Sequence, residues 1–250
     1  IPLPDSTEEL SVFQSTPEAP AEVVEYEDTA FGRRDAALTP LIVAAARKLK
    51  RVLADEQNDV LHALRSAKTA ITLDVLLASR DEQLRRYADA IDTELTAAAL
   101  AGAESIDDGP KKDHAKSITK GHALAPAVDA VGSTIVQPLR DRLDRAVADA
   151  EGDRDDLVAV VRAVYREWKN QRIDEHLDDI ALVAFGRGAL VALVPGTPVC
   201  WSVDPNGPDC PDAEDNALAG VVQAGDPFPT DHVCAPAHEG CRCMLQRVPR

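Results

Sequence analysis

The side chains best able to bind a metal ion are gathered at the C-terminal end of the chain. None of the five cysteines precedes position 200, and two of the six histidines lie among them. Zn²⁺ prefers thiolate and imidazole ligands in a tetrahedral arrangement. The ligands at the end of the cluster, on a tight turn over residues 238–243, can bind one ion together, and Cys210 of an earlier loop can contribute a further thiol. We therefore predict a zinc site with the four ligands Cys210, His238, Cys241 and Cys243. Three nearby residues are alternate ligands: His232, Cys200 and Cys234.

Two other states of these thiols remain open. Cys210 can form a disulfide bond with Cys241 or Cys243, or the cysteines can stay reduced and without a ligand. The odd number of cysteines favours neither state. The spacing is also less specific than a pair of Cys-x-x-Cys motifs, because Ala213 stands where the second thiol after Cys210 would be.

The motifs of known zinc enzymes do not fit this cluster. A zinc deaminase needs His-x-Glu and Pro-Cys-x-x-Cys, but Glu239 directly follows His238 and Ala213 replaces the second thiol. A zinc protease of the His-Glu-x-x-His type needs a second histidine, and that position is Arg242. No motif of a nucleophilic cysteine is readable either. We expect a protein that is not an enzyme, with no catalytic residue and no organic cofactor.

The segment that carries the cluster, residues 196–250, differs from the rest of the chain. It contains turn-forming runs, few apolar residues and two short segments typical of strands, 199–203 and 242–248. Small modules with little apolar material commonly need a covalent or metal crosslink. We predict a small Cys/His-rich α+β module here.

Residues 36–195 are predicted to form a helical body. Apolar residues recur at spacings of three and four over 36–66, 72–102 and 155–192, and the helical pattern also resumes near Pro126 and Pro138. The lysine-rich segment 103–123, which contains His114 and His122, is expected to be an exposed loop. The last helix is expected to bend near Gly186 and Gly188. The fold class is therefore mainly α, with an elongated multi-helix body that carries the C-terminal module.

Residues 1–35 are expected to be an extended acidic N-terminal arm. Four prolines prevent a helix, and acidic residues are frequent. Two interpretations are open: a disordered tail, or an arm that becomes ordered against a partner.

Charge and hydropathy exclude several classes of protein. The formal net charge is −16, which does not suit general binding to nucleic acid. A local basic cluster of Arg47, Lys48, Lys50 and Arg51, together with the lysines of 111–120, leaves a contact with packaged DNA open. No run of residues is long and apolar enough to span a membrane. The chain begins with Ile1, so we expect a processed form or a segment of a longer product.

Three strings near the C-terminus form a recognisable series: Cys210-Pro-Asp-Ala-Glu-Asp-Asn-Ala-Leu-Ala-Gly220, Gly225-Asp-Pro-Phe-Pro-Thr230 and Pro236-Ala-His-Glu-Gly-Cys-Arg-Cys243. This series resembles the C-terminal signature of the phage head-morphogenesis proteins, which are the Mu F-like minor capsid proteins, especially those of actinobacteriophages. The terminal motif is the most specific. Weaker helical similarity extends the resemblance to about residues 40–245, through three further strings: Ala54-Asp-Glu-Gln-Asn58, Tyr165-Arg-Glu-Trp-Lys-Asn-Gln-Arg172 and Phe185-Gly-Arg-Gly188. Many relatives have cysteine where this chain has Ala213.

The resemblance implies a structural virion protein. Such proteins are thought to lie in the head near the portal vertex in few copies, and to assist head assembly or genome delivery. The expected partners are the portal protein, the major capsid protein or further copies of this chain, and the expected locations are the virion and, during synthesis, the host cytoplasm. Two alternatives are a metal-dependent hydrolase or toxin-like effector carried in the head, and an ejection factor that contacts DNA.

Overall fold

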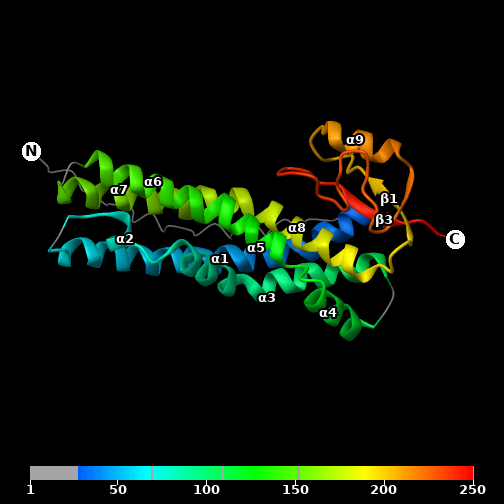
Figure 1. The fold of residues 1–250 in the computed structure, drawn as a ribbon, viewed down its shortest axis with the longest axis horizontal. Helices are drawn as coiled ribbons and strands as arrows, with labels where there is room; N and C mark the ends of the chain where they lie inside the picture. Colours follow the sequence, from blue (N-terminus) through cyan, green and yellow to red (C-terminus); the bar gives the residue numbers. More distant parts are fainter. Residues whose placement is uncertain (1–27, 69, 108–109, 151–152, 250) are drawn as a thin grey trace, which may run out of the picture.

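The computed structural model describes residues 28–68, 70–107, 110–150 and 153–249. They form an elongated bundle of long helices with a small module of strands, loops and one helix at one end (Figure 1). The protein is mainly α, as the helical periodicity predicted. Residues 1–27, which make up most of the predicted arm, lie outside the described residues.

Helix α1 (Ala30–Ser66) runs along the bundle and begins six residues earlier than predicted. It starts there because Thr29 is its N-cap: the Thr29 hydroxyl accepts a hydrogen bond from the Gly32 N–H (3.0 Å). The predicted apolar stripe is the buried face, from Leu38 to Leu64. Sequence periodicity therefore identified this helix, while the capping side chain determines its first residue.

The second long helix, α3 (Arg80–Ile106), follows a single turn, α2 (Leu73–Leu76). The next segment differs from the prediction, because the expected loop 103–123 contains the helix α4 (Lys111–Lys120). His114 and Ile118, four residues apart, form its buried face. The prediction that His114 is exposed was wrong: only 3% of the residue is accessible, because α4 packs its apolar face against α3 and α8.

The remaining helices of the body form two continuous stretches, and each includes a π-helical segment. The first consists of α5 (Ala125–Ala130), η1 (Val131–Val136) and α6 (Gln137–Asp149). The second consists of α7 (Arg154–Glu167), η2 (Trp168–Arg172) and α8 (Ile173–Ala192). The predicted helix over 155–192 therefore exists, but its irregular segment is η2. Helix α8 continues through Gly186 and Gly188 without interruption.

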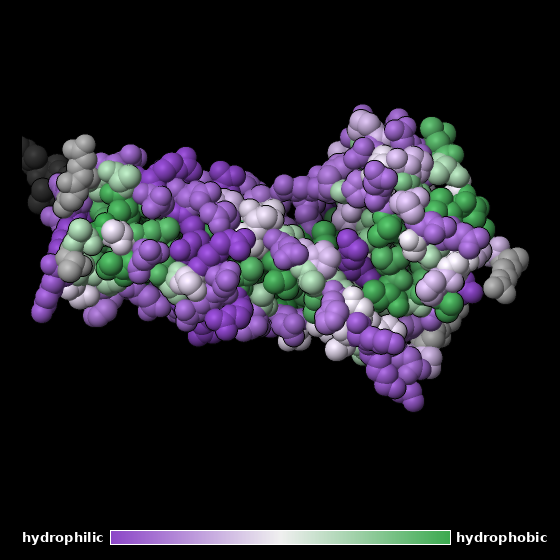
Figure 2. Space-filling view, viewed as in Figure 1, coloured by the Kyte–Doolittle hydropathy of each residue, from purple (hydrophilic) through white to green (hydrophobic). Residues whose placement is uncertain are grey.

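The C-terminal module contains a three-stranded antiparallel sheet in the order β2-β1-β3. Strands β1 (Pro198–Ser202) and β3 (Met244–Arg247) confirm the two predicted strands, and β2 (Val221–Gln223) was not predicted. A short helix, α9 (Pro211–Leu218), packs beside β1. In Figure 2 most of the visible surface of the helical bundle is hydrophilic, and apolar side chains gather on the module. Two apolar residues of the module, Leu218 and Val221, are exposed.

Two apolar cores hold most of the described structure together, beside a third, small cluster of Ala99, Ile118 and Ala123. The larger fills the helical bundle and includes one residue of the module, Met244. The smaller lies under the sheet, where Trp201 and Phe228 pack edge to face, and it includes Ile106 and Leu193 from the ends of α3 and α8. Because each core draws on residues of the other part, the module packs directly on the helical body.

Helices α3 and α8 cross at very short range through two glycines. A Cβ atom on Gly102 would lie 1.9 Å from the Phe185 carbonyl oxygen, and one on Gly188 would lie 1.9 Å from the Ala99 carbonyl oxygen. No side chain fits at these distances, so the two helices pack backbone to backbone. This contact explains why residue 188 is a glycine, near which the sequence pattern suggested a bend.

Gly188→Ala is therefore expected to destabilise the bundle by about 2 kcal/mol, because the two backbones must separate. This loss is expected although alanine favours an isolated helix by about 1 kcal/mol. Gly132→Ala is the matched control, since the atoms nearest to its Cβ would belong to flexible side chains, Leu84 at 3.3 Å and Arg80 at 3.5 Å, rather than to a backbone. Urea unfolding of both variants measures the difference, and equal stabilities would contradict the proposed close contact.

A buried polar network lies inside the bundle around Glu56, which is 3% exposed. The Glu56 carboxylate accepts hydrogen bonds from the hydroxyls of Tyr87 and Tyr165 (both 2.9 Å) and from the Gln83 amide (3.0 Å). The Gln83 carbonyl in turn accepts a hydrogen bond from Arg140 (2.9 Å). The Glu56 carboxylate thereby joins α1, α3 and α7, and α6 is joined to the same network through Gln83. The apolar periodicity did not predict this network.

Candidate metal centre

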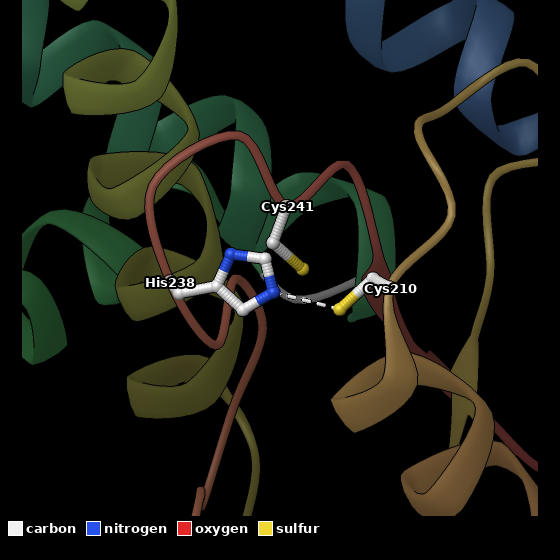
Figure 3. Close-up of side chains that lie close together, drawn as sticks. All are labelled: Cys210, His238 and Cys241. Atoms are coloured by element: carbon white, nitrogen blue, oxygen red, sulfur yellow. Dashed lines mark hydrogen bonds between the residues drawn. The ribbon is translucent and has the colours of Figure 1, made fainter.

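Three of the four predicted zinc ligands meet in the structure. The ligand atoms of Cys210, His238 and Cys241 all lie within 4.8 Å of one another, and the Cys210 Sγ lies 2.7 Å from the His238 Nε2. Figure 3 shows the three side chains pointing toward one another, with Cys210 at the start of α9 and the other two on the C-terminal loop. This group can bind a metal ion.

Cys210 is placed by helix α9, for which it is the N-cap. Its Sγ accepts a hydrogen bond from the Ala213 N–H (3.3 Å), and Pro211 occupies the first helical position. Helix α9 therefore fixes the Cys210 sulfur where it faces the His238 ring.

Cys241 lies in a setting that favours its ionised form. A hydrogen bond from the Cys243 thiol is the largest of the effects that lower the pKa of Cys241 to about 5, and backbone N–H groups of Ala237 and Cys243 act in the same direction. Burial opposes these effects. The same hydrogen bond, together with burial, raises the pKa of Cys243. Within this pair, the hydrogen bond favours the thiolate form of Cys241 and the protonated form of Cys243.

The His238 ring is oriented by a backbone carbonyl group. Its Nδ1 lies 2.7 Å from the Glu239 carbonyl oxygen, which can only accept a hydrogen bond. The proton of a neutral ring therefore lies on Nδ1, and the lone pair lies on Nε2, the atom that faces Cys210. Histidine ligands in metal sites are commonly held in this way, through the nitrogen that does not bind the metal.

The other predicted ligands lie outside the group of three. Cys243 neighbours Cys241 as its hydrogen-bond donor, but its sulfur is not within 4.8 Å of all three ligand atoms. Of the alternates, Cys200 is half-buried on β1, 4.0 Å from the Ser202 hydroxyl. Cys234 is buried in the module core, and burial raises the pKa of its thiol.

His232 is engaged elsewhere, since its Nδ1 forms a hydrogen bond with the Thr230 hydroxyl (2.8 Å). That hydroxyl donates to the carbonyl oxygen of the buried Asn216 (3.0 Å). All five cysteines are free in this structure. The disulfide between Cys210 and Cys241 or Cys243, which the spacing left open, is therefore not formed here.

Helix α8 holds the loop that carries His238 and Cys241. The His176 Nδ1 lies 2.9 Å from the Glu239 carboxylate, and the Asp179 carboxylate accepts a hydrogen bond from the Gly240 N–H (3.1 Å). An ion pair also joins Asp178 to Arg242. The sequence pattern did not single out these residues, although polar side chains at 176, 178 and 179, directly before the apolar run Ile180–Phe185, are a signal that could have found them.

A fourth contact comes from the first turns of α1. Arg34, whose side chain is fully buried, pairs with Asp204 (2.8 Å) and donates a hydrogen bond to the Arg242 carbonyl oxygen. Behind the loop, a Cβ on Gly186 would lie 1.8 Å from the Ala235 carbonyl oxygen. Both ends of the loop are therefore packed against the helical body.

Asp179→Ala is expected to loosen the loop by about 1 kcal/mol, because the Gly240 N–H loses its acceptor. Faster proteolysis within 236–243, with little change in the unfolding of the bundle, is the expected result. Asp174→Ala is the matched control, because Asp174 lies on the same helix and pairs with Lys50 of α1 rather than with the loop. Equal proteolysis of the two variants would contradict the assigned role of Asp179.

Comparison with protein-family models, with curated proteins and with solved structures finds no significant match for this chain. Among the described residues, no helix combines the length and apolar character that crossing a membrane requires.

Proposed function

We propose that this chain is a structural virion protein, a minor capsid or head-morphogenesis protein whose C-terminal module is held together by a zinc ion. One observation carries the proposal. The terminal motif on which the resemblance to the Mu F-like proteins rests contributes His238 and Cys241 to a three-residue metal-ligand group. The same motif is attached to the helical body through α8. The motif thus has a structural role: it supplies two of the metal ligands of the module and attaches the module to the helical bundle.

Zinc is the metal that this donor set fits best. Two sulfurs and one imidazole nitrogen are soft to borderline ligands, which suit Zn²⁺ and do not suit Mg²⁺ or Ca²⁺. We assign the fourth position to Cys243, which neighbours Cys241 and would lose its proton on binding, as thiols do when they bind a metal. Bound zinc would supply a tetrahedral crosslink between α9 and the C-terminal loop.

The surroundings of the cluster favour a structural site over a catalytic one. Both Cys210 and Cys241 are buried. Neither thiol lines the cavity on which His238 and Glu239 border. A catalytic zinc ion keeps one position open to its substrate, and four protein ligands would leave none. This is why we do not favour the hydrolase or toxin-like alternative.

Ion pairs formed by the lysines also disfavour the alternative in which this chain contacts packaged DNA. Lys48 pairs with Glu94 and Lys50 with Asp174 (2.8 and 2.7 Å). Lys111 and Lys116 pair with Glu104 and Asp113. Such pairing leaves less free positive charge for phosphate groups. The partners that we propose are therefore proteins of the particle, the portal or the major capsid protein, or further copies of this chain.

The decisive experiment locates the chain in particles. Phage particles from a host that produces this chain are purified by density gradient, and their proteins are quantified by mass spectrometry. We expect the chain at a low copy number relative to the major capsid protein, with density near the portal vertex in cryo-electron microscopy. Purified particles that lack the chain, while the infected cell contains it, would overturn the proposal.

A further inference from the structure

The outer edge of strand β2 is open for pairing. In the sheet order β2-β1-β3, β2 is an outer strand, and among the described residues no further strand pairs with it. The other outer strand, β3, packs against α3 and α8. A Cβ atom on Gly220 or Gly225, the glycines that flank β2, would meet nothing within 4 Å beyond its chain neighbours. The backbone at both ends of β2 is therefore uncovered.

The register of the sheet shows which backbone groups face this open edge. The Ala224 N–H donates a hydrogen bond to the Thr197 carbonyl oxygen (2.8 Å), at the end of the ladder between β1 and β2. Hydrogen-bonded and non-hydrogen-bonded positions alternate in an antiparallel pair, so Val222 also faces β1. Val221 and Gln223 therefore direct their N–H groups away from β1. A free strand edge of this kind is a template for a further strand.

Two strongly exposed apolar side chains lie beside the open edge. Leu218, the last residue of α9, is 84% exposed, and Val221 on β2 is 60% exposed. The two residues are three positions apart in the chain. Adjacent exposed apolar residues on an otherwise polar surface mark a site of interaction with another protein.

An apolar pocket of about 560 Å³ adjoins the end of β2. Its walls include Ala224 and Gly225, which directly follow the strand, and Leu190 and Val191 of α8. Apart from Lys120, the residues that line it are uncharged. A segment that pairs with β2 and continues beyond the strand meets this pocket, which can hold one of its apolar side chains.

The surface of the module around β2 is acidic. Residues 188–241 contain eight acidic residues and no lysine or arginine. Two of the eight, Asp204 and Glu239, have partners within the fold. The other six form no ion pair within the part of the chain that the structure describes: Asp209, Asp212, Glu214, Asp215, Asp226 and Asp231. All of these except the half-buried Asp212 are exposed, so a binding partner here meets unneutralised negative charge.

We propose that the outer edge of β2 binds a short extended segment of a partner protein that carries apolar and basic side chains, and that this segment joins the sheet as a further strand. In strand addition, backbone hydrogen bonds supply affinity, and the side chains of the segment supply specificity. The acidic surroundings favour lysine and arginine in the segment. They disfavour a second copy of this chain, which has a formal net charge of −16 and would present the same acidic surface. The proposed contact depends neither on the zinc ion nor on a place in the virion.

Two synthetic heptapeptides added to the full-length chain test the proposal. One alternates lysine with valine, and the other alternates glutamate with valine. Fluorescence anisotropy of the labelled peptides should give a Kd about tenfold lower for the lysine peptide, and added salt should weaken its binding. Hydrogen exchange followed by NMR should show slower exchange of the Val221 and Gln223 N–H groups in the complex. The Val222 N–H, which already faces β1, is the internal control and should be unchanged.

Charge variants identify the acidic residues that contribute. Asp215→Asn with Asp226→Asn removes one charge on α9 and one in the turn that follows β2, and should weaken binding of the lysine peptide severalfold. The matched control is Asp89→Asn with Asp92→Asn, which removes two exposed charges of α3 and should leave the Kd unchanged. Equal effects of the two double variants would contradict a local acidic contact.

Val221→Lys should also weaken binding of the lysine peptide, because it replaces an apolar contact with a like charge. Its matched control is Val75→Lys, at an exposed valine of α2, which lies at the far end of the bundle (Figure 1). Equal Kd values for the two peptides would overturn the proposal, and so would unchanged exchange at Val221 and Gln223. Protection of these two N–H groups that rises with protein concentration and needs no peptide would also overturn it, because the edge would then pair with a second copy.

Discussion

Cys241→Ser is expected to lower the zinc affinity of the chain by at least ~10²-fold. Serine keeps the shape of the side chain but replaces a thiolate, the ligand that Zn²⁺ prefers, with a hydroxyl group that stays protonated at pH 7. Binding of a structural zinc ion releases about 10–16 kcal/mol at this pH, so the loss of one of four ligands removes several kcal/mol. Competition with a chromophoric chelator measures the affinity, and elemental analysis gives the metal content per chain.

The same substitution should unfold the module and leave the bundle intact. Without the ion, residues 196–249 keep only a small apolar core around Trp201 and Phe228 and a few polar contacts with α1 and α8, so proteolysis should begin there while the helical signal persists. Cys200→Ser is the matched control, since Cys200 is half-buried on β1 and lies outside the cluster. A Cys241→Ser chain that binds zinc as tightly as the control would exclude Cys241 as a ligand.

Glu56→Ala is expected to destabilise the bundle by about 3–5 kcal/mol, comparable to breaking a buried charged network. Alanine leaves the two tyrosine hydroxyls and the Gln83 amide buried without their acceptor, and it also leaves a cavity. Tyr165→Phe removes one donor only and should cost about 1 kcal/mol. Unfolding in urea measures both values. Two variants of equal stability would mean that Glu56 is not the centre of the network.

The pH dependence of the Glu56→Gln variant provides an independent check. Burial is the largest effect on the Glu56 carboxyl and raises its pKa above the ordinary 4.5, although the hydrogen bonds from Tyr87, Tyr165 and Gln83 oppose it. An acid with a raised pKa in the folded state stabilises the fold below its unfolded pKa and loses that contribution as the pH rises through the folded value. The stability of wild type relative to Glu56→Gln should therefore fall as the pH rises above the ordinary value of 4.5. A constant difference would contradict a raised pKa.

The helices of the body could be predicted because their information is local. Apolar residues at spacings of three and four mark one face of a helix wherever that face is buried, as it is from Leu38 to Leu64 in α1. The ends of helices depend on single capping side chains, so α1 begins at Ala30, directly after its N-cap Thr29, rather than at residue 36. Helix α4 was missed because its apolar face consists of only two buried residues, His114 and Ile118.

The candidate metal centre was predictable in its residue types and only partly in its geometry. Thiols and an imidazole within the last fifty residues pointed to a shared site, and Cys210, His238 and Cys241 do meet. The distance between the first of these and the other two along the chain carries no information about their distance in space. Helix α9, which places Cys210 as its N-cap, and the carbonyl group of Glu239, which orients His238, come from the folded backbone.

The amino-acid sequence by itself determined the secondary structure of the rod, the separate character of the C-terminal module and the kinds of ligand available to a metal, since all of these depend on residue types and short spacings. Tertiary structure alone decided which ligands converge, that α8 holds the loop through His176, Asp178 and Asp179, and that Gly102 and Gly188 let two helices touch. These are contacts between segments up to some two hundred residues apart, as between Arg34 and Arg242. They arise because burying the apolar faces brings such segments together, and no local pattern encodes which polar groups then meet.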